Sequence, residues 1–123
     1  MKETALWDLI NERRERMSFA QRRLWDTISI DPEQWIHRTS AGADLHIWVV
    51  ALIGRTVISY NDLEHGFDRS NFVRYGEITQ LGWGQSDLEI AVQDVLNELE
   101  FGRRTAPNVS EPKPETYPGQ GSR

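Results

Sequence analysis

The segment Leu45 to Ile53, LHIWVVALI, is apolar at every position except His46 and is rich in β-branched residues. A run that is apolar on both alternating faces predicts a central strand buried from both sides. Gly54-Arg55 follows directly, and a second β-branched run, Thr56 to Asn61, comes after it. This is the pattern of a two-residue hairpin in which glycine supplies the positive φ, so the two runs predict an antiparallel pair.

The hairpin turn predicts the register of this pair and therefore its two faces, because side chains alternate along a strand. The expected partners are Val49 with Tyr60, Ala51 with Ile58, and Leu52 with Val57. The face expected to pack against helices carries Ile47, Val49, Ala51, Ile53, Ile58 and Tyr60. The other face, which becomes more polar toward the end of the second run, carries Trp48, Val50, Leu52, Val57, Ser59 and Asn61.

The segments before this hairpin predict one more strand and helical structure. Proline at position 32 disfavours helix for the residue before it, and Glu33 to Arg38 predicts a short strand that would complete a three-stranded antiparallel meander. Ser18 and Gln21 form an S-x-x-Q capping box, which predicts the start of a helix. The apolar stripe nevertheless continues in phase across Ser18, so residues 5–29 predict either one long helix or a helical hairpin.

A C-terminal helix is predicted by the helical spacing of Leu88, Val92, Val95, Leu96 and Leu99. The predicted fold class is α+β, with this helix and the N-terminal helix or helical hairpin packed on one face of the meander. Residues 1–104 are expected to form a single compact domain. Residues 105–123 hold four of the five prolines and predict a disordered tail.

Composition excludes several classes of function. Because the chain has no cysteine, disulfides, thiolate nucleophiles and Cys-ligated metal centres are excluded. A net charge of −5 argues against a protein whose main task is to neutralise nucleic-acid phosphates. The longest apolar run is strand-sized and the N-terminus lacks a signal-peptide pattern, so we expect a cytoplasmic protein without a membrane partner.

The segment after the second run of the hairpin, YNDLEHGFD, holds most of the residues that could act chemically. A purely structural interpretation makes Asn61 the N-cap of a one-turn helix that ends at Gly66 in the left-handed conformation, with Leu63 and Phe67 pointing inward. A functional interpretation makes the segment an acidic rim for a basic protein partner. The candidate partner-binding residues are Trp48, Asn61, Asp62, Glu64, His65 and Asp68.

Two other chemistries remain as alternatives. A divalent ion held by Asp62, Glu64 and His65 would make a hydrolase or nuclease, although the spacing matches no standard metal motif, and we expect no metal or other cofactor. Residues 12–23 carry five arginines against two glutamates. This cluster is either a solvated helix face or a nucleic-acid contact through Arg13, Arg14, Arg16, Arg22 and Arg23.

The histidines are scattered along the chain, at positions 37, 46 and 65. His37 and His46 would face each other if the first two strands paired about Ala41 and Gly42. Such a cross-strand pair with a loop carboxylate would be a conceivable metal site.

The run WVVALIGRTVISYNDLEHGF, preceded by DPEQW, resembles small uncharacterised bacterial α+β domains of the immunity-protein type, some of them encoded near toxin or secretion genes. The resemblance covers about residues 24 to 100 and carries over no functional residue. It implies a non-enzymatic protein that acts by binding. We therefore predict a small cytosolic interaction protein, an immunity or regulatory partner that binds through its acidic loop, with the two chemistries above as alternatives.

Overall fold

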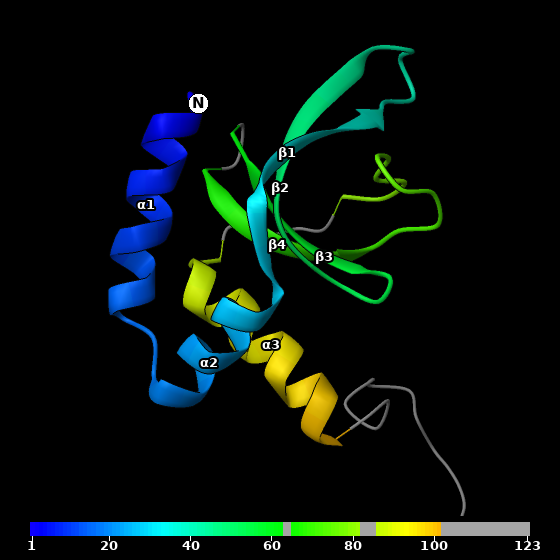
Figure 1. Cartoon of the computed structure of the whole chain (residues 1–123). Coiled ribbons are helices and arrows are strands. Elements are labelled where there is room, and N and C mark those ends of the chain that lie inside the picture. The colour runs from blue at the N-terminus through cyan, green and yellow to red at the C-terminus, as the bar shows by residue number, and fades with distance from the viewer. Residues whose placement is uncertain (63–64, 82–85, 102–123) are drawn as a thin grey trace, which may run out of the picture.

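The computed structural model describes residues 1–62, 65–81 and 86–101. In these ranges three helices lie on one face of a four-stranded antiparallel sheet (Figure 1). The elements are α1 (Glu3–Glu15), α2 (Phe19–Ile28), β1 (Ser29–Arg38), β2 (Asp44–Ile53), β3 (Thr56–Asn61), β4 (Gly66–Asn71) and α3 (Leu88–Phe101). The predicted α+β class is confirmed, and the sheet has one strand more than predicted. The expected tail, residues 105–123, lies outside the described ranges.

The N-terminal region is a helical hairpin, because the capping box at Ser18 starts a second helix. The Ser18 hydroxyl accepts a hydrogen bond from the backbone N–H of Gln21 at 3.2 Å, and the Gln21 side chain accepts one from the Ser18 N–H at 2.8 Å. These two bonds satisfy donors that a helix start would otherwise leave unpaired. Of the two alternatives for residues 5–29, the two-helix one is correct.

The strands follow one another in the order β1-β2-β3-β4, so the sheet is a meander. β1 begins at Ser29 and not at Glu33 as predicted, and it therefore includes Pro32. The pairing with β2 is irregular between Ser29 and Glu33. A proline has no N–H to donate to a ladder, so an irregular stretch of an outer strand is where a sheet tolerates one.

The prediction of a one-turn helix at Asn61 to Gly66 is wrong. Asn61 is the last residue of β3, and it pairs with Gly66, the first residue of β4, across a hairpin turn. The residue with a left-handed backbone is His65, at φ 57°, rather than Gly66. Phe67 points into the core as expected, whereas Leu63, the other predicted anchor, lies outside the described residues.

The predicted register of the β2–β3 hairpin is confirmed next to the turn and is wrong farther from it. The confirmed pairs are Ala51 with Ile58 and Leu52 with Val57. Val49 pairs with Ser59 instead of Tyr60, because a β-bulge places one extra residue between Val49 and Ala51.

The bulge also exchanges the faces predicted for the first half of β2. Trp48 and Val50 lie on the helix-covered face, and Ile47 and Val49 lie on the opposite face. The residues between the bulge and the turn keep their predicted faces. A strand that gains one residue turns every side chain beyond that point to the other face of the sheet, which is the reason for the error.

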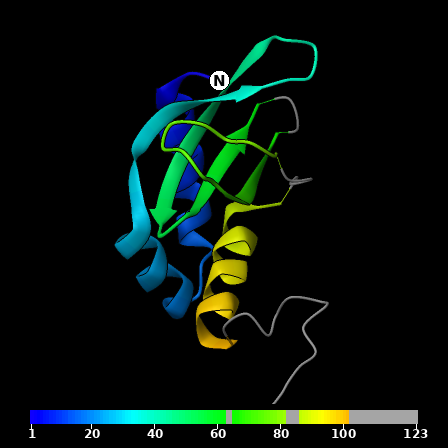
Figure 2. The same ribbon diagram turned by 90° about the vertical axis from the view of Figure 1, so that its right-hand side faces the viewer.

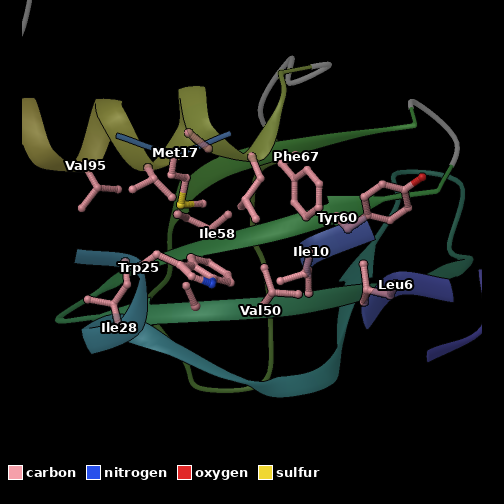
Figure 3. Packing of buried hydrophobic residues seen from close by; sticks show 14 residues of the cluster. Leu6, Ile10, Met17, Trp25, Ile28, Val50, Ile58, Tyr60, Phe67 and Val95 are labelled. Atoms are coloured by element: carbon pink, nitrogen blue, oxygen red, sulfur yellow. The ribbon is translucent and has the colours of Figure 1, made fainter. Parts of the chain in front are cut away.

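The larger of two apolar cores lies between the helices and the sheet, and all three helices contribute to it (Figure 3). Its buried residues are Leu6, Ile10, Met17, Trp25, Ile28, Val50, Ala51, Ile58, Tyr60, Phe67, Leu88, Ala91, Val92 and Val95. The predicted packing of the N-terminal and C-terminal helices on one sheet face is thus confirmed. No helix of the described residues is both long and apolar enough to cross a membrane.

A second core lies on the other face of the sheet, under the segment formed by residues 72–81. This segment crosses the sheet on the side away from the helices (Figure 2). It buries Ile78 against Trp35, Ile47, Val49 and Val57. Its residue Glu77 forms a parallel bridge with Ile36, so the segment also pairs with the outer edge of β1.

Candidate functional site

The predicted partner-binding residues near the β3–β4 turn differ in their surroundings. Asn61 is buried at the end of β3, whereas Asp62 and His65 are exposed. The Asp62 carboxylate forms an ion pair with the α-amino group of Met1. Glu64 lies outside the described residues. Burial, together with the nearby Asp62 carboxylate, raises the pKa of the Tyr60 hydroxyl above its ordinary value.

The remaining two predicted residues lie on opposite faces of the sheet. Trp48 packs on the helix side, and its indole N–H donates to the carbonyl of Met1 at 3.1 Å. Asp68 pairs with Ser59, and because the neighbouring pair Tyr60 and Phe67 points to the helices, Asp68 points away from them. The predicted exposed face around Trp48 is therefore wrong, and the predicted residues do not share one surface.

The histidine pair is not formed either. In the β1–β2 register His46 lies opposite Ile36, and His37 lies opposite Leu45, so the two rings are on opposite faces. Within the part of the chain that the structure describes, no three His, Asp or Glu side chains are grouped as a metal site requires.

The arginines of residues 12–23 contact groups of the N-terminal helices, except Arg13, which pairs with Asp87 just before α3. Arg14 donates two hydrogen bonds to Asp26, at 2.8 and 2.5 Å, and these lower the pKa of the Asp26 carboxyl. The other contacts are Arg13 with Asp87 at 3.5 Å, Arg16 with Glu12 at 3.5 Å, Arg22 with the carbonyls of Arg14 and Glu15, and Arg23 over the ring of Phe19. The arrangement agrees with a helix surface that satisfies its own charges.

A different group of side chains comes together on the face opposite the helices. The ring of Tyr75 lies 4.7 Å from that of the buried Trp35, centroid to centroid, and Phe72 packs edge-on against Trp35 at 5.1 Å. The Tyr75 hydroxyl donates to Glu33 Oε1 at 2.6 Å, and the Trp35 indole N–H donates to the same oxygen at 3.2 Å. One carboxylate oxygen of β1 thus holds a strand residue and a loop residue together.

These two hydrogen bonds favour an ionised Glu33 and a neutral Tyr75. The bond from Tyr75, and secondarily the one from Trp35, lowers the pKa of the Glu33 carboxyl. The bond to Glu33 raises the pKa of the Tyr75 hydroxyl. Across the neutral pH range the carboxylate therefore accepts both bonds.

The backbone that follows Tyr75 is bonded to β1 on both sides of Glu77. The Ile36 N–H donates to the Gly76 carbonyl at 3.0 Å, and the Ile78 N–H donates to the Ile36 carbonyl at 2.9 Å. His37 Nδ1 lies 2.8 Å from the Ile78 carbonyl, which can only accept, so Nδ1 carries the proton. Gly76 has a φ of 91°, which disfavours any residue with a Cβ.

Two side chains of this loop are nevertheless largely exposed: Val73 is 80% exposed and Tyr75 is 60% exposed. We refer to residues 72–75, Phe72 to Tyr75, as the aromatic loop. None of the site residues predicted from the sequence lies in this stretch. The available signal was the run FVRYG, in which two aromatic residues and a valine precede a glycine in a segment with no helical or strand period.

Comparisons of the chain with protein-family models, with curated proteins and with solved structures gave no match. The fold and the geometry of the described residues are therefore the only basis for a functional proposal. They define a small α+β domain with a fixed, exposed aromatic loop.

Proposed function

We propose that this protein is a small cytosolic, non-enzymatic interaction protein, an immunity or regulatory partner, that acts by binding a second protein. The observation that carries the proposal is the exposure of Val73 and Tyr75 on a loop that is held to β1 by the Tyr75 hydroxyl and, directly after it, by the backbone of Gly76 and Ile78.

The aromatic loop has the properties of a binding hot spot. Tyrosine is among the residue types enriched at such positions, because it offers a large contact area with few rotatable bonds. The Tyr75 ring is already held by Trp35 and its hydroxyl by Glu33, so little conformational entropy remains to be lost on binding. A loop that is already ordered before binding suits a partner that covers it.

The partner we propose is a basic protein. The chain carries a net charge of −5, which attracts a basic partner over long range and speeds its encounter. The ionised Glu33 and the exposed Asp31 of β1 supply negative charge on the strand that holds the aromatic loop. Asp62 and His65, exposed at the β3–β4 turn, remain the alternative contact proposed from the sequence.

Capture of the partner from an extract of the source cells by the immobilised full chain tests this proposal. We expect one basic protein to be captured by the wild type, and to be lost with Tyr75→Ala. The matched control is Phe19→Ala, because Phe19 is an aromatic side chain that is 76% exposed on another element, α2. Capture of this protein should decrease as salt increases.

Two results would contradict the location or the class of function. If Asp62→Asn releases the partner while Tyr75→Ala retains it, the contact lies at the β3–β4 turn. If Mg²⁺, Mn²⁺, Ca²⁺ or Zn²⁺ markedly raises the melting temperature, the native state binds that ion and the metal-dependent alternative gains support. Retention on heparin that weakens steeply with salt would favour the nucleic-acid alternative instead.

A further inference from the structure

A cleft of about 560 Å³ lies at the end of the molecule where β2 turns into β3. Its walls are the β2–β3 turn, the end of β4 with the start of the aromatic loop, and the C-terminal half of α3. The apolar part of its lining consists of Ile53, Phe72, Val73, Val95 and Leu99. This volume falls within the range of roughly 300 to 1,000 Å³ that is usual for small-molecule sites, which also have mainly apolar walls.

The cleft exists because the apolar stripe of α3 continues past the core. Val95 is buried against the sheet, but Leu99, one helical turn later, is 55% exposed. The stripe predicted from the sequence is therefore only partly covered by the described residues. Leu99 and the exposed Val73 form two apolar sides of the opening.

Most polar groups of the lining are bonded to one another or to a neighbouring side chain. The Thr56 hydroxyl donates to Asn71 Oδ1 at 3.0 Å. Glu98 accepts from Arg69 at 2.6 Å, so its charge is balanced. The guanidinium of Arg55 is the exception, because no carboxylate in residues 1–62, 65–81 and 86–101 pairs with it. Among the described residues, the cleft thus combines apolar walls with an arginine that no carboxylate neutralises.

From this complementarity we infer that the cleft binds an organic anion with an apolar body and a single anionic head group. The body would pack between Leu99 and Val73, and Arg55 would donate to the head group. An arginine fork matches a planar carboxylate or a similar oxyanion, and the charge makes these hydrogen bonds stronger than neutral ones. This ligand site overlaps the proposed protein contact at Phe72 and Val73, but it does not include Tyr75.

Two dyes that share a ring system test the inference on the full chain. Anilinonaphthalene sulfonate has an apolar body and one anionic group, and phenylnaphthylamine has a closely similar body without the charge. We expect the sulfonate to bind with a stoichiometry near one, and more tightly than the neutral dye. In proton–nitrogen correlation spectra the sulfonate should shift signals of residues 53–56, 71–73 and 95–99.

Matched variants separate the cleft from general dye binding. Arg55→Ala should weaken binding of the sulfonate about tenfold and leave the neutral dye unchanged. Arg38→Ala is its control, because Arg38 is exposed near the opposite end of the β1–β2 pair. Leu99→Ser should weaken both dyes several-fold, whereas Ile90→Ser should not, although Ile90 is 50% exposed on the same helix and lies outside the cleft.

Several outcomes would overturn the inference. They are equal binding of both dyes, equal losses with Arg55→Ala and Arg38→Ala, and shifted signals that lie outside the cleft. If the sulfonate binds only after removal of residues 102–123, this segment of the chain is the occupant. If the cleft signals shift with protein concentration as a dimer forms, the occupant is a second copy. If the wild type captures no protein, or Tyr75→Ala retains it, the proposed function fails while the dye results stand, so the two proposals fail separately.

Discussion

The two faces of the sheet are covered in different ways. Three helices cover one face and build a core of 14 buried residues, whereas a loop covers the other with a core of five. The helix side depends on apolar side chains spread over the whole chain. On the loop side the apolar contacts come from β1, β2 and β3, but β1 provides the hydrogen bonds through Glu33 and the backbone of Ile36. A cover with so few hydrogen bonds to the sheet can open locally without unfolding the rest.

Removal of one large ring from each core is the strongest test of this comparison. Phe67→Ala on the helix side and Trp35→Ala on the loop side should each lower the free energy of unfolding by about 3 to 5 kcal/mol, because both rings are buried. Urea denaturation measures both losses. Phe19→Ala, which removes an exposed ring, should change stability by no more than about 0.5 kcal/mol.

The view that both cores stabilise the protein would be wrong if the core under the loop contributed little to the free energy of unfolding. A loss below about 1 kcal/mol for Trp35→Ala, with the full loss for Phe67→Ala, would mean that Trp35 is readily replaced by its neighbours or by water. The proposal of a firmly held aromatic loop would then lose its support.

The second prediction concerns the backbone of the loop. Gly76→Ala should cost about 1 to 2 kcal/mol, because a φ of 91° places a Cβ in a conformation that L-residues avoid. Since a Cβ would meet no atom within 4 Å there, the cost is conformational and not steric crowding. We expect the loss of protection from hydrogen exchange to concentrate at the amides of Ile36 and Ile78, which form the two backbone hydrogen bonds between β1 and this loop. An equal loss at the amide of Ile58, in β3, would show that the loop does not open separately.

The sequence predicted the helix side better than the loop side, for physical reasons. A helix buries one stripe, so apolar spacing and a capping box identify it in the sequence, as at Ser18 and Gln21. β4 was missed because its residues after Phe67 are polar, as an outer strand allows, and the alternation was too weak to recognise. The bulge in β2 inserts a residue without any glycine or proline to mark it, so the faces before it were assigned in reverse.

The candidate site was harder to predict than the fold. Most of the site residues predicted from the sequence are polar or charged. The β3–β4 hairpin and the β2 bulge nevertheless place Trp48 and Asp68 on opposite faces of the sheet. The contact between Glu33 and Tyr75 joins positions 42 residues apart in the sequence. Such contacts depend on the path of the loop across the sheet, and no local spacing encodes that path.

The helix side offers a smaller, matched test. Ser18→Ala should cost about 1 kcal/mol, because it removes the acceptor for the Gln21 N–H at the start of α2. The loss should appear in urea denaturation, while protection at Ile36 and Ile78 changes only as much as that of Ile58. A loss confined to the loop amides would contradict the division into two separately held sides.

The smallest effect concerns the pH dependence of the loop. The pKa of Glu33 is lower in the folded protein than its ordinary value of 4.5, so its contribution to stability is complete above that value and is lost as the pH falls through the lowered pKa. The pKa of Tyr75 is raised above 10.0, so its contribution is present below that value and is lost as the pH rises through the raised pKa. Both groups are largely exposed, so solvent screening keeps the effect small.

Hydrogen exchange on the acid side of this range measures the contribution of Glu33. The protection factors of Ile36 and Ile78 should decrease between about pH 6 and pH 3 more than that of Ile58, since protonation weakens the carboxylate that holds Tyr75 and Trp35. Glu33→Gln should have lower protection at pH 6 and should lose this additional pH dependence. If the wild type and Glu33→Gln show the same pH dependence, other carboxylates determine the acid sensitivity of the loop, and Glu33 does not hold it in place.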